Sequence, residues 1–262
     1  MVSSTAIGIA LISGSGGTGR TTAALNLSYK LAGQESRVLL ADMCFGWGGL
    51  TSFASHLVSY ETLLDCDEDY DGIITRTAHG FDLLTCIPQE LLEPSVNDFK
   101  KFAWLISRLN FNYDYIIFDT PAGGHPLALL AAGMSRRVFL FIRPDAVSFA
   151  TSFRLLKSLH SEGIYERVGA IFSFVRSAEH AASLKTRFDL ITGRYIGSRI
   201  SSGGFIPASG TMMSEEFVLP VPNSESVKII ENFSLDEPLP LQNETELPAH
   251  GRINPGWFEE RR

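Results

Sequence analysis

Short apolar runs alternate along the chain with longer segments in which apolar residues recur every three or four positions. The short runs are rich in β-branched and aromatic residues, which favour strands, and the longer segments have the period of amphipathic helices. Strands are therefore expected at residues 7–12, 37–41, 81–86, 115–118, 138–142 and 168–174, and helices at 21–32, 95–109, 125–134, 149–162 and 179–191. Because the two alternate, and runs such as 115–118 are apolar throughout, the sequence predicts an α/β fold with a doubly wound, mainly parallel sheet flanked by helices.

Two stretches lack this regular pattern. Residues 198–214 contain several glycines and the pair Met212-Met213 without a clear period, which indicates a loop, a mobile insertion or a partner-binding loop. From residue 236 onward the chain is rich in proline and polar residues and has too few apolar side chains to order by itself. We therefore expect one folded domain over residues 1–235 and a disordered, Pro-rich tail over 236–262.

Composition narrows the class of protein. Among 262 residues, 29 acidic side chains outnumber 22 basic ones, so the net charge of -7 gives no overall attraction to nucleic acid. Cys44, Cys66 and Cys86 have no metal-binding spacing, and the N-terminus lacks a charged-then-apolar signal region, so we expect a cytoplasmic, reduced protein. Direct transmembrane insertion is not expected, since no apolar run approaches the roughly 20 residues that cross a bilayer.

One segment has the spacing of a phosphate-binding loop. Between the first expected strand and helix, Gly14-x-x-x-x-Gly19-Arg20-Thr21 follows the pattern that usually ends in Gly-Lys-Thr. Glycines let such a loop turn its N–H groups toward phosphate oxygens, and the helix N-terminus adds a favourable dipole. The candidate cofactor-binding residues of this loop are Gly14, Ser15, Gly16, Gly17, Thr18, Gly19, Arg20, Thr21 and Thr22. A plain Gly/Ser-rich turn is the alternative, which the strand before it and the helix after it disfavour.

Residues 15–22, Ser-Gly-Gly-Thr-Gly-Arg-Thr-Thr, resemble the deviant Walker motif Lys-Gly-Gly-x-Gly-Lys-Thr-Thr of the ParA/MinD family of dimeric ATPases. The resemblance covers most of the chain. Residues 38–42 are similar to the family's second strand, which ends in an aspartate, and residues 115–123 to its Walker B and switch II segment. Residues 139–144, 169–175 and 219–222 resemble its later strands and proline turns. The resemblance implies a homodimer that binds ATP and Mg²⁺.

The resemblance also implies the roles of the residues around the phosphates. Thr21 would place its hydroxyl on Mg²⁺, and Asp119, at the Walker B position, would hold the ion through water. Asp42 and Asp119 are the candidate catalytic carboxylates. The alternatives are that Asp42 only caps its loop and that Asp119 caps helix 125–134. Gly123 or Gly124 would donate an N–H to a γ-phosphate and move when that phosphate leaves.

The base pocket is implied by two further positions. Ser173 stands where the family often has an asparagine, and Pro222 is expected to form a wall of the pocket. Since the sequence contains no Asn-Lys-x-Asp motif for guanine, ATP is the favoured nucleotide.

Three positions depart from the family pattern. Ser15 stands where the family has a signature lysine that reaches the partner's nucleotide, Arg20 where it has the Walker lysine, and Cys44 where it has the second aspartate of Asp-x-Asp. Arginine keeps the charge, but its planar fork fits poorly in a loop shaped around a compact ammonium. Phosphoryl transfer depends on positioning and charge stabilisation, so we expect an ATPase that is slow at most. Cys44 is not favoured as a nucleophile, because no histidine is expected beside it.

Candidate partner surfaces lie late in the chain. Trp257-Phe258 in the polar tail form a candidate motif for docking on protein subunits of a larger membrane-associated assembly, which would recruit the chain to the inner face of the membrane. The tail has no continuous apolar face for a membrane-binding helix of the MinD kind. A local group of basic residues is compatible with DNA binding, but an ordinary solvent-exposed face explains the group equally well. These residues are Arg176, Lys185, Arg187, Arg194 and Arg199.

The leading hypothesis is an ATP-binding regulatory or scaffolding protein of the ParA/MinD type that positions or activates a larger bacterial assembly. Cellulose or exopolysaccharide secretion complexes, pili and secretion machines are the candidate assemblies, because motif departures also occur in family branches of the BcsQ and TadZ types. Two alternatives stay open. One is an active DNA- or cargo-partitioning ATPase, and the other is a pseudo-ATPase that binds no nucleotide and serves as an interaction module.

Overall fold

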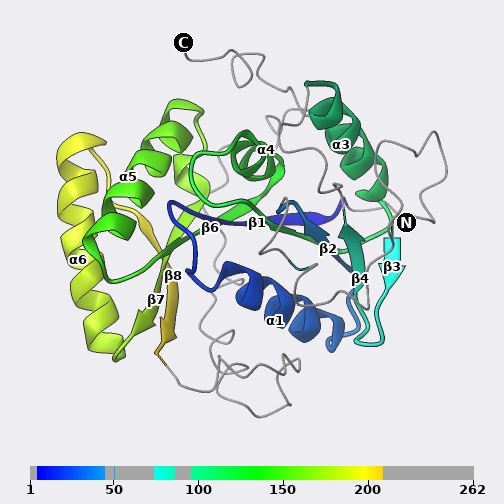
Figure 1. Ribbon diagram of the computed structural model, residues 1–262, viewed down its shortest axis with the longest axis horizontal. Coiled ribbons are helices and arrows are strands. Elements are labelled where there is room, and N and C mark those ends of the chain that lie inside the picture. Colours follow the sequence, from blue (N-terminus) through cyan, green and yellow to red (C-terminus); the bar gives the residue numbers. More distant parts are fainter. Residues whose placement is uncertain (1–4, 45–49, 51–73, 86–95, 209–262) are drawn as a thin grey trace.

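The computed structural model describes residues 5–44, 50, 74–85 and 96–208, and these form a layered α/β structure (Figure 1). The strands are β1 (Ile7–Ser13), β2 (Val38–Asp42), β3 (Ile74–Arg76), β4 (Asp82–Thr85), β5 (Tyr115–Asp119), β6 (Arg137–Ile142), β7 (Val168–Val175) and β8 (Ser201–Pro207). The helices are α1 (Arg20–Ala32), α3 (Val96–Leu109), α4 (Pro126–Met134), α5 (Ala146–Ser161), the short η2 (Tyr165–Arg167) and α6 (Ala178–Tyr195).

The strands form one 8-stranded sheet in the order β3-β4-β2-β5-β1-β6-β7-β8. All neighbouring strands pair in parallel except β3, which is antiparallel to β4 at the edge. The order reverses at β1, with β5 on one side of it and β6 on the other. In open α/β sheets, ligands bind at the carboxyl ends of the strands next to such a reversal.

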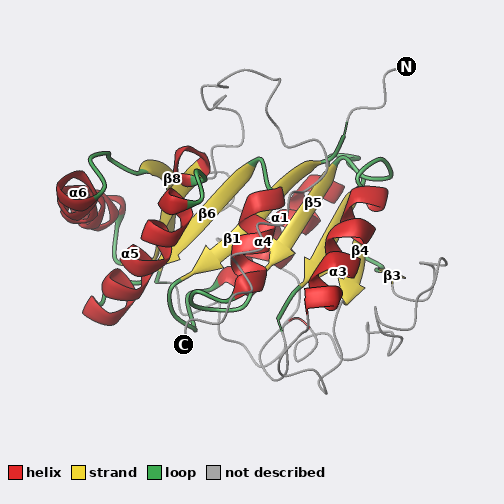
Figure 2. Cartoon of the chain, turned by 90° about the horizontal axis from the view of Figure 1, so that it is seen from above, coloured by secondary structure: helices red, strands yellow, loops and turns green. Residues whose placement is uncertain are grey.

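Both faces of the sheet are covered. Along β1, Ala10 and Ile12 belong to one apolar core while Ile9 and Leu11 belong to the other, because successive side chains of a strand point to opposite faces. Helices α3, α4, α5 and α6 contribute to the first core and α1 to the second, so α1 and α4 lie on opposite sides of the sheet (Figures 1 and 2). The prediction of a doubly wound, mainly parallel sheet is confirmed.

The expected strands and helices are present, with some ends displaced by a few residues. The largest extension at a helix start is in α5, which begins before residue 149 because the Asp145 carboxylate accepts a 2.8 Å hydrogen bond from the Ser148 N–H. Ser177 caps α6 in the same way, accepting from the N–H of His180 at 3.2 Å. Such side-chain caps satisfy N–H groups that the helix itself leaves free.

The interpretation of residues 198–214 as a loop is wrong at residues 201–207, which form strand β8 beside β7. Glycines usually weaken strands, but here they permit a close approach of two backbones. A Cβ on Gly203 would lie 2.9 Å from Cδ1 of Phe139 and 3.0 Å from Cγ1 of Ile171, and a Cβ on Gly169 would lie 3.2 Å from the Gly203 Cα. The edge strand β3 was also not expected, since three residues are too few to show a period.

Gly203→Ala is expected to lower the free energy of unfolding by about 1–3 kcal/mol, because the added methyl group overpacks a core that has no free space beside it. Gly193→Ala is the matched control. Gly193 lies in α6, and none of the residues that the structure describes comes within 4 Å of its Cβ position, so alanine there should stabilise the protein by about 1 kcal/mol through helix propensity. Urea denaturation measures both. Equal effects of the two substitutions would contradict the packing role of Gly203.

Candidate phosphate-binding site

The loop between β1 and α1 lies at the carboxyl edge of the sheet. Gly17 and Gly19 adopt left-handed backbone conformations, with φ of 65° and 82°, which side chains other than glycine rarely tolerate. Gly19 is also the N-cap of α1, where no side chain caps the helix and the first turn contains no acidic residue. Free N–H groups and the positive end of the helix dipole therefore face the loop, which favours an anion there.

The first part of the loop packs on helix α5. Gly14 is buried, and a Cβ at this position would lie 2.3 Å from the backbone N of Ser152 and 2.3 Å from the backbone C of Thr151. Next to it, the Ser15 hydroxyl forms a 3.3 Å hydrogen bond with the hydroxyl of Ser148. The position that holds a signature lysine in the ParA/MinD pattern therefore carries a neutral side chain that is engaged within its own chain.

Arg20 crosses from the loop to the segment that follows β5. Its side chain is 8% exposed, and Nη1 donates to the carbonyl oxygens of Thr120 and Pro121, the latter at 3.0 Å. Burial lowers the pKa of this guanidinium, while the negative charge of Asp119 acts in the opposite direction. An arginine remains charged under these conditions. Arg20 thus bonds to protein carbonyls at the place where the loop pattern would have a cation on phosphate.

The segment after β5 is held against β1 by two more hydrogen bonds. The Thr120 hydroxyl donates to the carbonyl of Leu11 at 2.8 Å, and the Gly123 N–H donates to the carbonyl of Ser13 at 2.8 Å. Gly123 has φ of 83°, so the turn depends on glycine. In this arrangement, the N–H expected to meet a γ-phosphate is bonded to β1, and its contact with phosphate stays a prediction.

Asp119 ends β5 beside the loop and is fully buried. Neither of its carboxylate oxygens has a hydrogen-bond partner of normal geometry among the described residues. Burial raises the pKa of Asp119, and the charge of Arg20 together with the nearby Thr21 hydroxyl and Cys44 thiol acts to lower it. The alternative in which Asp119 caps α4 is wrong, because His125 Nδ1 accepts from the Leu127 N–H at that helix end.

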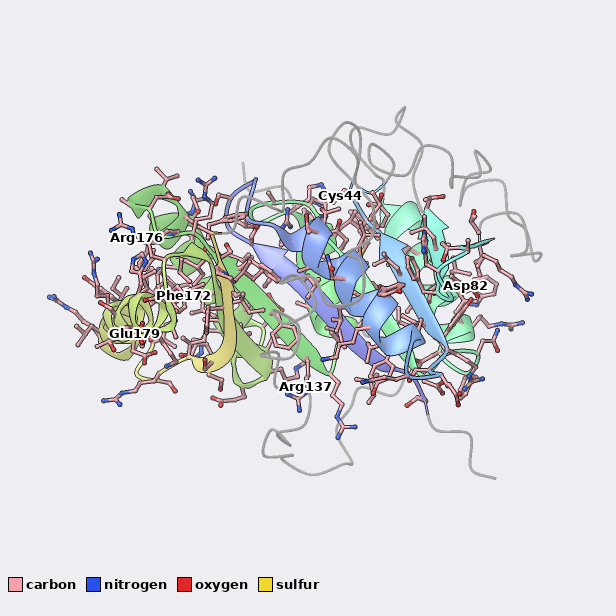
Figure 3. The ribbon with its side chains drawn as sticks, turned by 90° about the horizontal axis from the view of Figure 1, so that it is seen from below. Cys44, Asp82, Arg137, Phe172, Arg176 and Glu179 are labelled. Carbon is pink, nitrogen blue, oxygen red and sulfur yellow. The ribbon has the colours of Figure 1, made fainter. Side chains whose placement is uncertain are left out.

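Asp42 and Cys44 complete the edge of the site. Asp42 pairs in register with Asp119, and one ligand atom each from Asp42, Cys44 and Asp119 lie within 4.8 Å of one another. Asp42 is buried and accepts a 2.9 Å hydrogen bond from the Cys44 N–H, so it does cap its own loop. Figure 3 shows Cys44 at this carboxyl edge and Arg137, the first residue of β6, at the opposite edge.

The residues present fit a hydrated Mg²⁺ ion. Mg²⁺ prefers oxygen ligands and keeps several waters. The two buried Asp119 oxygens, which have no partner of normal geometry in the described part of the chain and lie next to the Thr21 hydroxyl, supply such oxygens. Thr21 and Asp119 would hold the ion, with Asp42 nearby. A thiol is a poor ligand for Mg²⁺, so Cys44 adds nothing to this set.

Cys44 is expected to react slowly with alkylating reagents. Burial raises the pKa of its thiol, and the negative charges of Asp119 and Asp42 raise it further, so little of the reactive thiolate exists near neutral pH. Timed N-ethylmaleimide labelling with peptide mass spectrometry should give a Cys44 rate at least about tenfold below that of glutathione at pH 8. Labelling as fast as glutathione would instead support a reactive thiol at this site.

The structure brings together the loop residues 14–22, Asp42, Asp119 and Gly123 at one edge. Ser173 lies on β7, is fully buried, and its hydroxyl has no partner among the described residues, so its contact with a base stays a prediction. Pro222 and the Trp257-Phe258 motif lie outside the described residues. None of the helices in the described ranges is long and apolar enough to cross a bilayer.

Two residues at the loop were missed by the sequence reading. Phe174 has φ of 58°, an unusual conformation for a residue with a side chain, and its ring lies 3.3 Å from the Cβ position of Gly19. Arg143 lies over this ring, with Cζ 5.8 Å from the ring centroid. A β-bulge such as that around Phe174 leaves no mark in the hydrophobic pattern. Arg143 could have been found, since it follows directly after a strand that ends at this edge.

A glycine-rich turn from a parallel strand into an uncapped helix, flanked by a buried aspartate on the neighbouring strand, defines a P-loop nucleotide-binding protein. The comparison with family models is more specific. The model described as the CobQ/CobB/MinD/ParA nucleotide binding domain matches residues 9–209, and the chain belongs to this family. The predicted membership of the ParA/MinD family is thereby confirmed.

Individual relatives are distant. A protein of Emiliania huxleyi assigned as the septum site-determining protein MinD is 25% identical over an alignment of 266 residues, gaps included. The alignment covers 94% of this chain and 84% of the relative. The antiactivator FleN of Pseudomonas aeruginosa is 22% identical over 204 residues, and this match covers 76% of this chain and 72% of FleN. The structure of MinD from Pyrococcus horikoshii complexed with Mg-ADP superposes with a TM-score of 0.64 at 22% identity, covering 86% of this chain and 93% of that one.

Proposed function

We propose that the chain is an ATP-binding regulatory or scaffolding protein that positions or activates a larger bacterial assembly and hydrolyses ATP slowly or not at all. The observation that carries the proposal is the state of the P-loop. Its backbone is built to bind phosphate, whereas the three positions expected to drive hydrolysis hold Ser15 bonded to Ser148, Arg20 bonded to carbonyls, and a half-buried Cys44. Relatives named as an antiactivator and as septum site-determining proteins support a regulatory role.

The geometry suggests how a bound nucleotide would act on the protein. Mg²⁺, held by Thr21 and Asp119, would neutralise phosphate charge. Phosphate oxygens would compete with the Thr120 and Pro121 carbonyls for the Arg20 guanidinium, and with the Ser13 carbonyl for the Gly123 N–H. Binding would therefore loosen the segment after β5 from its present contacts. Such an exchange is the switch by which ATP would control a homodimer or a protein partner.

A phosphate-release assay combined with gel filtration tests this proposal. We expect saturating ATP and Mg²⁺ to give turnover far below the ~1 s⁻¹ at the low end of ordinary enzymes, and ATP to shift the elution volume toward a dimer. Asp119→Ala should abolish the ATP-dependent shift. Turnover at the rate of an ordinary ATPase, lost in Asp119→Ala, would contradict the scaffolding role and favour an active motor.

An active partitioning ATPase is the second candidate, because α6 and the residues flanking it present exposed arginines. Arg176, Arg187, Arg194 and Arg199 are exposed, whereas Lys185 is engaged with Asp189 at 2.7 Å. This candidate predicts ATP-dependent DNA binding that weakens with salt and in an Arg194→Glu, Arg199→Glu double variant. Absence of DNA binding at low salt with ATP would remove it.

Docking through the Trp257-Phe258 tail is tested separately. Pulling down partners with the full chain and with a variant lacking residues 248–262 should show loss of the assembly subunits from the shortened chain. Identical partner sets would assign the interaction to the folded domain.

A further inference from the structure

A second arginine lies at the exposed part of the phosphate loop. Arg143 directly follows β6, which pairs in parallel with β1, so the chain leaves both strands at the same edge of the sheet. Its Nη1 atom lies 3.5 Å from the position that a Cβ of Gly17 would occupy. Gly16 and Gly17 are exposed, so this guanidinium lies beside the part of the loop that is open to a ligand.

The backbone of Arg143 is fixed, while its charged group is loosely held. The Arg143 N–H donates to the Ser148 hydroxyl at 2.9 Å, which ties it to the same serine that binds Ser15. Among the described residues, the guanidinium forms one ion pair, from Nε to the Asp145 carboxylate at 3.6 Å, and its side chain is 46% exposed. An exposed ion pair of this length contributes little stability, so the guanidinium is free to bind a stronger anion.

Phe174 supplies a platform for this guanidinium. It lies at an irregularity of β7, where the register with β8 shifts between Ser173 and Val175, and its left-handed conformation points the ring toward the loop. The Cζ atom of the ring lies 3.3 Å from the Cβ position of Gly19, and the Arg143 Cζ lies over the ring at 5.8 Å from its centroid. An arginine over an aromatic ring is held by cation–π attraction while its N–H groups remain available in the plane of the fork. Backbone strain that is retained beside a ligand loop is typical of functional positions.

The rest of the loop lacks a cation directed at its open part. Ser15 is neutral, and Arg20 is buried on the Thr120 and Pro121 carbonyls. Thr22 is expected to reach a phosphate nearer the nucleoside, so the exposed Gly17, earlier in the loop, is expected to lie toward the terminal phosphate. We propose that Arg143 binds the terminal phosphate of a nucleoside triphosphate within its own chain and makes the site select triphosphate over diphosphate. This inference rests on the proposed nucleotide binding.

Calorimetric titration of the full chain with the triphosphate analogue AMPPNP and with ADP, both with Mg²⁺, tests the assignment. Arg143→Ala should weaken AMPPNP binding at least about tenfold while changing ADP binding less than about threefold. Arg143→Lys should give an intermediate loss, because lysine keeps the charge without the planar fork. Arg136→Ala, which removes an exposed arginine just before the opposite end of the same strand, is the matched control and should change neither affinity.

Each other outcome overturns the assignment. Equal losses of AMPPNP and ADP affinity in Arg143→Ala would indicate a structural role, and unchanged AMPPNP affinity would show that the guanidinium does not meet the phosphate. Thermal unfolding without nucleotide checks that the variants fold. If Arg143→Ala does not fold, Arg143→Lys gives the same comparison of AMPPNP with ADP affinity. Wild-type protein that binds neither nucleotide would overturn the proposed function together with this inference, whereas binding without triphosphate selectivity would overturn only the inference.

Discussion

Gly14→Ala is expected to destabilise the nucleotide-free protein by about 3 kcal/mol or more and to abolish nucleotide binding. The added Cβ would lie 2.3 Å from backbone atoms of Thr151 and Ser152, a distance that only a displacement of the loop or of α5 could relieve. Overpacking against flexible side chains costs about 1–3 kcal/mol, and a backbone contact leaves less freedom to adjust. Urea denaturation measures the stability, and nucleotide titration measures the binding.

Gly16→Ala is the control for this prediction within the same loop. Gly16 has no atom of the described residues within 4 Å of its Cβ position and no left-handed backbone, so alanine should leave the free energy of unfolding within about 0.5 kcal/mol of the wild type. Similar stabilities of Gly14→Ala and Gly16→Ala would show that the loop does not pack on α5 as described.

The second large effect is expected at Arg20. Arg20→Met should lower the free energy of unfolding by about 2–4 kcal/mol, since it removes charged hydrogen bonds to the Thr120 and Pro121 carbonyls. It also leaves the fully buried Asp119 carboxylate without the favourable charge of Arg20. The same variant should lose the coupling between nucleotide binding and the segment after β5. Urea denaturation and hydrogen exchange of residues 119–124 measure the two effects.

A double variant separates the two causes. If part of the loss comes from the uncompensated charge, then Arg20→Met combined with Asp119→Asn should be more stable than Arg20→Met alone, because asparagine removes that charge. Nucleotide binding that depends on Mg²⁺ should stay absent in the double variant. Strictly additive destabilisation by the two substitutions would show that Arg20 and Asp119 do not interact.

The hydrophobic pattern was sufficient for most of the fold. Strands such as 115–118 are buried on both faces and read as continuous apolar runs, while the amphipathic helices show their period directly. Strand β8 could not be predicted this way, because it depends on the approach of Gly203 to Gly169, Phe139 and Ile171, which all lie more than thirty residues earlier in the chain. A glycine-rich segment reads as a loop unless its partners are known.

The candidate site was predictable where it depends on spacing. The loop residues and Asp119 follow a pattern whose order along the chain is enough to place them at one edge. The direction of the Arg20 side chain was not predictable, because it depends on the Thr120 and Pro121 carbonyls, about a hundred residues later in the chain. Phe174 was missed for a related reason, since a bulge and a left-handed residue arise from strand pairing and not from local preference. Arg143 is different, because its place directly after a strand was visible in the sequence.

Calorimetric titration of ATP with Mg²⁺ into the full chain tests most directly whether this loop holds a nucleotide. We expect saturable binding with one ATP per chain and a Kd in roughly the micromolar range. Chelation of Mg²⁺ or the Asp119→Ala substitution should weaken it strongly. A titration that shows no binding of ATP or ADP up to about 1 mM nucleotide, in protein that is folded by circular dichroism, would contradict the assignment and favour an interaction module without nucleotide.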